Sequence, residues 1–275
     1  MGNFYQAVSS NKSKLLVPLL DTFTGATVAY SLRKLRTDYT GAAVEVYNGS
    51  SFADIGFANN KLDTTALETH CGSNDGFVSK WYSQGTSSNT ATQTISSQRP
   101  KIYDGTSGYL NALKFTPAGN TNLQLSISFD MSNVSAALVA QANAASSGTI
   151  IDAHETSVFR EFAFGISNGN VQTSIKFNGQ ASKSQSIAAF DDLFLATMFA
   201  DNTPANDSYI NGSQMTGSFA PAMTPNTTNN IRIGQRGSGT ADFSGFIREF
   251  VVYFSDESSN RIGIENNIDA FYSIY

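Results

Sequence analysis

Short runs of apolar residues, many of them alternating with polar ones, fill the chain from Leu110 onward. Segment 122–129 (NLQLSISF) alternates strictly, which predicts a strand with one face in a core and the other in water. Segments 135–143 and 148–154 are nearly continuous apolar runs, which predict buried strands. Regular short strands joined by tight turns are typical of a β-sandwich or barrel. The turns are predicted at Asn48-Gly49, Asn168-Gly169, Asn178-Gly179 and Asn211-Gly212.

Helical spacing appears near the two ends of the chain. In segment 25–41 (GATVAYSLRKLRTDYTG), apolar residues recur at helical intervals before a glycine, which predicts a short N-terminal helix. Segment 259–275 predicts an amphipathic C-terminal helix that lies against the sandwich, with Asp256 or Ser258 as its cap. The predicted apolar face of this helix consists of Ile264, Ile268, Phe271, Tyr272 and Tyr275.

The composition agrees with one β-rich domain. The chain has 275 residues, enough to bury a large core, and only 14% of them are charged while 12% are aromatic. The start of the chain is polar and lacks periodicity, so residues 1–18 are interpreted as an arm. Residues 19–275 are interpreted as a single domain, because no shift in composition marks a linker.

Charge and cysteine content narrow the possible partners and the compartment. A net charge of -5 argues against nucleic acid or an anionic membrane as the partner. The single cysteine, Cys71, allows no internal disulfide. The first residues do not read as a secretory signal, and no stretch is long and apolar enough to span a membrane. We therefore expect synthesis in a reducing cytosol.

Motifs for nucleophilic and metal-dependent catalysis are incomplete. The segment 165–169 (GISNG) matches the pattern of a serine hydrolase, but that motif needs a strand-to-helix turn and a later histidine. Both histidines, His70 and His154, come earlier in the chain. A closed zinc site would need carboxylates besides these histidines and Cys71. No cofactor is expected, although a calcium site formed by loop oxygens stays open, since it needs no fixed spacing.

A pair of carboxylates is the remaining route to catalysis, because a glycosidase needs one as acid and one as base or nucleophile. The alternative for most acidic residues is a turn or a solvated strand face. Asp191 and Asp192 precede an apolar strand, which favours a turn. Glu249 lies between Phe246 and Phe250 in a predicted strand, where alternation favours an outward position. The candidates are Asp152, Glu155, Glu161, Asp191, Asp192, Asp242 and Glu249.

The only tryptophan lies beside a tyrosine in segment 76–82 (GFVSKWY). Aromatic faces stack on sugar rings, so Trp81 and Tyr82 are candidate carbohydrate-binding residues. The two side chains alternate along the predicted strand, so one of them points inward, and a single tryptophan in a strand is more often part of the core.

Several stretches, in order, resemble known jelly-roll domains. They are AYSLRKLRTDYTGAAVEV, DIGF, DGFVSKWYSQ, NTATQ, QRPKIYDG, ALKF and IRIGQRGSGTADFSGFIREFVVYFSD. The stretches up to ALKF are similar to concanavalin A-like, laminin-G-like domains of bacteriophage virion proteins. They are also similar to the catalytic domain of the fungal α-L-arabinofuranosidase B family, and the last stretch resembles the closing strands of that family. The resemblance, from about Leu19 to Tyr275, implies an all-β, concanavalin A-like jelly-roll sandwich, which joins the polar arm and the two terminal helices predicted from the sequence pattern.

The resemblance to the hydrolase implies catalytic positions that this chain fills only in part. It places Glu161 at the nucleophile. At the general acid it places Gln235 and Arg236, neither of which can protonate a leaving group at ordinary pH. Asp242 is close in sequence to that position but out of register. The family's adjacent cysteine pair is missing, and Ser83 replaces an aspartate.

These departures lead us to expect a structural protein of a phage particle without enzymatic activity, located in the virion and able to bind surface glycans. The arm would anchor it to other virion proteins, and a homotrimer is expected by analogy with other appendages. A glycoside hydrolase and a stand-alone lectin are the alternatives. The expected carbohydrate-binding residues are Trp81, Tyr82, Glu161, Arg236 and Asp242. The expected assembly residues are Leu15, Leu16, Val17, Leu19 and Leu20.

Overall fold

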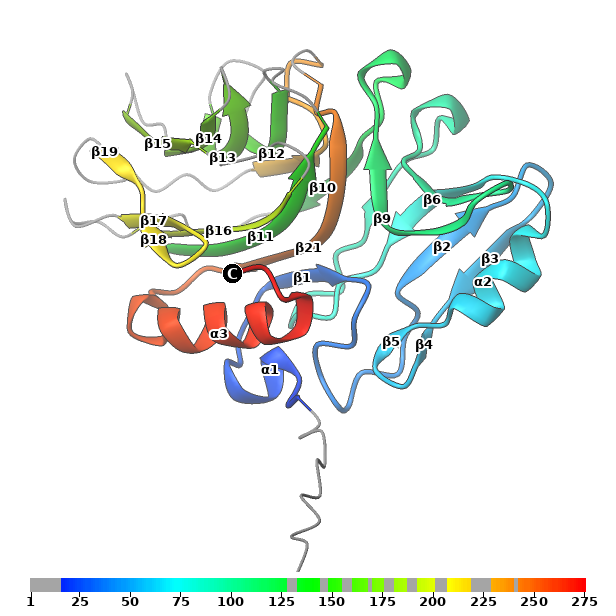
Figure 1. The fold of residues 1–275 in the computed structure, drawn as a ribbon, viewed down its shortest axis with the longest axis horizontal. Coiled ribbons are helices and arrows are strands. Elements are labelled where there is room, and N and C mark those ends of the chain that lie inside the picture. Colours follow the sequence, from blue (N-terminus) through cyan, green and yellow to red (C-terminus); the bar gives the residue numbers. More distant parts are fainter. Residues whose placement is uncertain are drawn as a thin grey trace, which may run out of the picture.

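The structure, a computed structural model, describes residues 16–127, 133–143, 148–154, 160–167, 170–175, 181–186, 192–200, 207–218, 229–239 and 242–275. Its strands pair antiparallel and fold into two stacked layers (Figure 1). We call the first the helix-covered layer. It comprises β1 (Val28–Ser31), β11 (Val134–Ala142), β16 (Leu193–Ala200), β17 (Asp207–Ile210), β18 (Ser213–Gln214) and β21 (Gly245–Tyr253).

We call the second the polar-faced layer, because one of its faces carries polar side chains. Its strands are β2 (Val44–Tyr47), β3 (Phe52–Ile55), β6 (Gly76–Trp81), β7 (Ala91–Thr92), β10 (Leu123–Ile127), β12 (Gly148–His154), β13 (Arg160–Ser167), β14 (Asn170–Ile175), β15 (Ala181–Ser186), β19 (Thr216–Ser218) and β20 (Asn229–Ile233). The layers are joined by β8 (Lys101–Asp104) and β9 (Gly108–Phe115), while β4 (Phe57–Ala58) and β5 (Lys61–Leu62) form a separate hairpin.

Within the described residues, three helices complete the fold: α1 (Leu19–Thr22), α2 (Thr64–Cys71) and α3 (Arg261–Tyr272). Single 3-10 turns occur at Ser96–Gln98, Pro117–Gly119 and Ser258–Asn260. Both α1 and α3 lie beneath the helix-covered layer (Figure 1). As a result β11, which pairs with β16 and β21, is buried on both faces. This explains its nearly continuous apolar sequence, since a strand covered on both sides has no face to leave polar.

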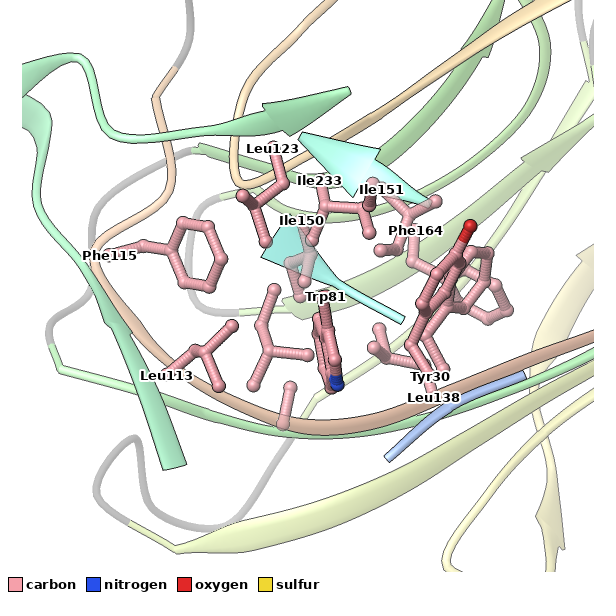
Figure 2. Close-up of a cluster of buried hydrophobic side chains, with 14 of the residues drawn as sticks. Tyr30, Trp81, Leu113, Phe115, Leu123, Leu138, Ile150, Ile151, Phe164 and Ile233 are labelled. Carbon is pink, nitrogen blue, oxygen red and sulfur yellow. The ribbon is translucent and has the colours of Figure 1, made fainter. Parts of the chain in front are cut away.

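The main core lies between the two layers. Trp81 is fully buried there, with its ring centroid 5.6 Å from that of Tyr30, and Figure 2 shows it among side chains from both layers. Its indole Nε1 is also buried and has no hydrogen-bond partner within the described part of the chain. The structure therefore leaves no face of Trp81 open to a sugar, and the residue acts as a core anchor.

The sandwich and the C-terminal helix predicted from the sequence are confirmed. The turns at Asn48-Gly49 and Asn211-Gly212 join β2 to β3 and β17 to β18, and both residues of the second turn have positive φ angles of 48° and 74°, as a tight hairpin requires. The other two predicted Asn-Gly turns lie outside the described residues, as does the second half of segment 165–169. The first half of that segment belongs to β13, which pairs with β14.

Three details of the helices differ from the predictions. Segment 25–41 forms β1 rather than a helix, because Val28 and Tyr30 enter the core while Ala29 faces the helices, so both sides of the strand are apolar. The short N-terminal helix is instead α1. Helix α3 begins after Asn260, so Asp256 and Ser258 do not cap it. Helix α2 was not predicted.

The residues expected to serve assembly, 15–20, differ in burial on the two sides of Pro18. Leu19 and Leu20 are buried within this chain, where they pack in the same cluster as Ile264 and Ile268 of α3. Val17 is exposed and Leu16 is partly buried, while Leu15 lies outside the described residues. An anchoring role for residues 1–18 stays a prediction. Within the described residues, no helix is long and apolar enough to cross a membrane.

Candidate functional site

A row of polar side chains crosses the outer face of the polar-faced layer. Residues directly opposite each other in an antiparallel pair project to the same face, so the strand register places them side by side. Their neighbours along each strand point into the core instead, including Trp81, Ile151 and Ile233. We call this set the polar row. In spatial order it consists of Asp152, Arg232, Gln124, Thr92, Lys80 and Glu45.

A loop between β20 and β21 folds over one end of the polar row. The backbone N–H of Gly237 in this loop donates a hydrogen bond of 2.6 Å to Asp152 Oδ2, which leaves Asp152 only 1% exposed. The loop begins at Gly234, whose φ is +87° and where an added Cβ would lie 2.1 Å from the Phe115 ring. Glycine is therefore required at this position, both for its conformation and for the close approach.

Arg232 is the centre of a network beneath this loop. Its Nη1 donates to Gln235 Oε1 at 3.0 Å and to the carbonyl of Arg236 at 3.3 Å, and its Nη2 reaches Gln124 Oε1 at 3.4 Å. Burial lowers the pKa of Arg232, while the charges of Asp152 and Asp242 oppose that shift. Its Nε is buried and unpaired within the described part of the chain. The described residues therefore leave this buried donor unsatisfied.

Asp242 lies beside the residue that the family resemblance placed at the general acid. Gln235 Nε2 donates a hydrogen bond of 2.6 Å to Asp242 Oδ1, although the two residues are separated in sequence by the turn of the loop. Asp242 is partly exposed, and its backbone forms a bridge to Thr149 of β12. The loop thus holds the Asp242 carboxylate within hydrogen-bond distance of Gln235.

Glu161 lies on β13, next to the strand that carries Asp152. The register between β12 and β13 shifts so that Ala153 opposes Phe162 while His154 opposes Arg160, which makes Glu161 the extra residue of a β-bulge. Bulges of this kind are common beside active sites because they redirect a side chain. The side chain of Glu161 lies outside the described part of the structure.

The other sequence candidates are placed as follows. Arg236 belongs to the loop over the polar row and is partly exposed. Tyr82 follows β6, and its hydroxyl donates to Asp54 Oδ1 at 2.7 Å. Ser83, found where the resembling family has aspartate, accepts hydrogen bonds from the N–H groups of Ala29 and Gly85. Ser83 therefore ties the following turn to β1.

Glu249 is not a catalytic candidate, because the structure buries it in a closed ion pair. Its carboxylate accepts two hydrogen bonds from Arg33, at 2.7 and 2.9 Å, and further bonds from Ser31 and Tyr272. The prediction of a solvated outward position is wrong, since α3 covers that face of β21. Asp192 is exposed directly before β16, in agreement with a turn, while Glu155 and Asp191 lie outside the described residues.

Within the described residues, no three His, Cys, Asp or Glu side chains gather closely enough to hold a metal ion. His70 lies on α2, where a ring nitrogen is 3.0 Å from the carbonyl of Val46. Most of the polar row escaped the sequence analysis, because its members come from strands far apart in the chain. The signal that could have found them is strand alternation, which leaves Gln124, Lys80 and Glu45 outward between core residues.

No family model and no curated protein match this chain. Solved structures do match. A GH54 α-L-arabinofuranosidase soaked with a cyclic sulfate inhibitor gives a TM-score of 0.68 at 16% identity. A glutamate-to-glutamine mutant of GH54 α-L-arabinofuranosidase, soaked with 4-nitrophenyl α-L-arabinofuranoside, gives 0.69 at 17% identity. An arabinofuranosidase complexed with arabinofuranosyl-α-1,2-xylobiose gives 0.65 at 17% identity.

Each of these matches covers 92% of this chain, whereas the chain spans 64% of the length of each matched structure. The likeness confirms the fold predicted from the sequence. The expectation of a protein without enzymatic activity is contradicted by this comparison, because these three structures, each matching 92% of the chain, are arabinofuranosidases. The virion location, the anchoring arm and the trimer are not tested by these matches and stay predictions.

Proposed function

We propose that this protein is a glycoside hydrolase that removes arabinofuranosyl groups from a glycan at the polar row. The observation that carries the proposal is the hydrogen bond between Gln235 and Asp242, which supports a carboxyl group beside the residue that the family resemblance puts at the general acid. The similarity in fold to arabinofuranosidases over 92% of the chain supports the same assignment.

The proposed mechanism uses two carboxyl groups. Asp242, partly exposed in the loop, donates a proton to the oxygen of the departing group, while Glu161, at the bulge of β13, attacks the anomeric carbon. A retaining glycosidase of this type holds the two groups about 5–5.5 Å apart and forms a glycosyl-enzyme intermediate that water then hydrolyses. Asp242, deprotonated by the first step, takes a proton from that water.

Arg232 and Asp152 serve as positioning residues. Asp152 holds the loop through Gly237 N–H, and Arg232 holds Gln235, which in turn orients the carboxylate of Asp242. Arg232 is partly exposed, and we propose that its guanidinium also bonds a hydroxyl group of the sugar. Pre-organisation of this kind matters because a displacement of about 1 Å in a catalytic group lowers rates by about a hundredfold.

The test is hydrolysis of 4-nitrophenyl α-L-arabinofuranoside, followed by the absorbance of released 4-nitrophenolate. The wild-type protein is expected to turn over this substrate, and Asp242→Asn and Glu161→Gln are each expected to lower kcat by about a hundredfold or more. Asp38→Asn is the matched control. It removes a carboxylate that pairs with Arg36 on the surface, so its activity should equal that of the wild type.

Two further readouts separate the roles of the carboxylates. Added azide should restore turnover to Glu161→Ala, because azide replaces the missing nucleophile. It should not restore turnover to Asp242→Asn on a substrate with a poor leaving group, because that step still lacks its proton donor. Binding of the substrate by calorimetry without any hydrolysis would contradict the proposal and leave a sugar-binding protein. Equal activity in the wild type and in both carboxylate variants would contradict the assigned residues.

A further inference from the structure

A concave site lies away from the polar row. A cavity of about 470 Å³ opens between the β4–β5 hairpin, the start of α2, β9, β21 and the end of α3. Its size lies in the range of about 300–1,000 Å³ that is typical of small-ligand sites. None of its lining residues belongs to the polar row or to the loop that covers it. The cavity therefore needs an explanation of its own.

Two cationic side chains face this cavity. Arg248 lies on β21 where the pairing with β11 shifts register, so that Ile247 and Glu249 are paired on either side of it. The Nε of Arg248 is buried and has no hydrogen-bond partner within the described residues. Lys61, exposed at the end of the β4–β5 hairpin, is the second cation.

The acidic residue of the cavity is already engaged. Asp63 caps α2 by accepting a hydrogen bond of 3.0 Å from the N–H of Ala66. A buried guanidinium N–H without a partner is costly, and a carboxylate is the acceptor that satisfies it best. The charge balance of the cavity, with Lys61 and Arg248 against Asp63, thus favours a ligand with one negative charge.

The remaining walls suit a sugar ring. Tyr109, Phe271 and Tyr272 contribute aromatic surface, and aromatic rings stack on the apolar faces of sugars. Burial raises the pKa of Tyr109 to about 12, against the opposing charge of Arg248, so its hydroxyl remains a neutral donor at pH 7. Asn59 and Asn111 add amide groups that can bond ring hydroxyls.

We propose that this cavity binds a uronic acid unit, with its carboxylate on Arg248 and Lys61 and its ring against the aromatic wall. The unit is either a free monosaccharide or a residue of an acidic polysaccharide. This site is independent of the proposed hydrolysis, because it uses none of the same residues and requires no bond to break.

The experiment is calorimetric titration of the full chain with D-glucuronate, D-glucose, inorganic phosphate and an oligosaccharide that ends in a glucuronosyl residue. Glucuronate should bind at least about tenfold more tightly than glucose, because only the acid reaches the arginine. Arg248→Gln should abolish that preference, and Lys61→Gln, at an exposed position, should reduce it. Arg36 lines a different cavity. The variant Arg36→Gln removes the same charge there, so it should bind glucuronate as the wild type does.

The outcomes distinguish the sources of the ligand. Binding of the oligosaccharide but not of free glucuronate supports the site and assigns it to a polysaccharide, while tighter binding of the free acid assigns it to a metabolite. Equal affinity for glucose and glucuronate overturns the proposal. It is also overturned if phosphate binds as well as glucuronate, or if the folded Lys61→Gln variant keeps the full preference.

Discussion

The outer faces of the two layers carry charged networks that differ in how completely they are paired. Beneath α3, Arg33 and Glu249 are both fully buried and hydrogen-bonded to each other in two places. On the polar-faced layer, Arg232 is partly exposed and keeps one buried N–H without a partner in the described residues. A closed network serves structure, whereas an incompletely paired one can still bind a ligand.

The elements that pack over the two faces explain this difference. Helices α1 and α3 exclude water from the first face through apolar side chains such as Ile264 and Ile268. The second face is covered at one end only by the glycine-rich loop of segment 234–239, whose backbone supplies N–H groups rather than apolar area. Apolar burial stabilises the fold at the first face, and accessible polar groups provide chemistry at the second.

The largest loss of stability is expected when one partner is removed from the buried ion pair of Arg33 and Glu249. Glu249→Ala leaves the Arg33 guanidinium buried without its charge partner, which should lower the free energy of unfolding by about 3–5 kcal/mol. Urea denaturation of the two proteins measures the change. Arg33→Met combined with Glu249→Leu removes both charges and should recover much of the loss. A loss below about 1 kcal/mol for the single variant would contradict a closed, buried pair.

A slightly smaller loss of stability is expected when a buried side chain of α3 is truncated. Ile268→Ala removes a fully buried side chain between α3 and the layer, and should cost about 2–5 kcal/mol through lost burial and a residual cavity. Ile262, on the same helix but 61% exposed, is the matched control, and Ile262→Ala should change stability by at most about 0.5 kcal/mol. Similar losses for both variants would show that α3 does not cover the layer as described.

One acidic residue on each face should contribute to the free energy of unfolding with an opposite dependence on pH. Burial raises the pKa of Glu265, a residue of α3 that bonds to the layer beneath, and this effect outweighs its hydrogen bonds with Thr197 and Arg261. The pKa of Glu45 is lowered, because bonds from Lys80 and Ser79 outweigh the effect of its burial. Unfolding curves between pH 3 and 8, for the wild type, Glu265→Gln and Glu45→Gln, measure each contribution.

The signs follow from which state binds the proton more tightly. Glu265 has a raised pKa in the folded state, so its contribution to stability is largest below its ordinary pKa of 4.5 and is lost as pH rises through the folded value. Glu45 has a lowered pKa, so its contribution is present above 4.5 and is lost as pH falls through the folded value. The same sign for both residues would contradict the contrast between the two faces.

The smallest effect is expected at the exposed end of the polar row. Lys80 Nζ lies 2.8 Å from Glu45 Oε2, but the lysine side chain is 41% exposed. Exposed ion pairs contribute about 0–1 kcal/mol, so Lys80→Ala should hardly change the urea midpoint. A double-mutant cycle with Glu45→Ala isolates the pair, and a coupling well above 1 kcal/mol would mean that this end of the row is more closed than described.

The strands were predictable where burial differs between their two faces. Alternation in β10 matches one buried and one open face, so the sequence prediction there was direct. In β1 the pattern misled, because Val28 and Ala29 are both buried, on opposite faces, and a doubly covered strand imitates helical spacing. Helix α2 carries only two buried residues, Leu67 and Cys71, and so gives a weak periodic signal.

The candidate site was predictable only in part. Asp242 and Arg236 were found from a local resemblance, but the hydrogen bond between Gln235 and Asp242 depends on how the loop turns back. The polar row depends on strand register between segments that lie far apart in the chain, as in the pairing of Asp152 with Arg232 and of Arg232 with Gln124. Which residues become cross-strand neighbours cannot be predicted from a single sequence, since the pairing of strands is set by the whole fold.

The most direct test of the contrast between the two faces is a crystal structure of Glu161→Gln soaked with 4-nitrophenyl α-L-arabinofuranoside. The account predicts a furanose ring on the polar-faced layer, with the leaving oxygen within hydrogen-bond distance of Asp242 and a ring hydroxyl near Arg232. A sugar bound elsewhere, with the polar row empty, would contradict the assignment of chemistry to the incompletely paired face.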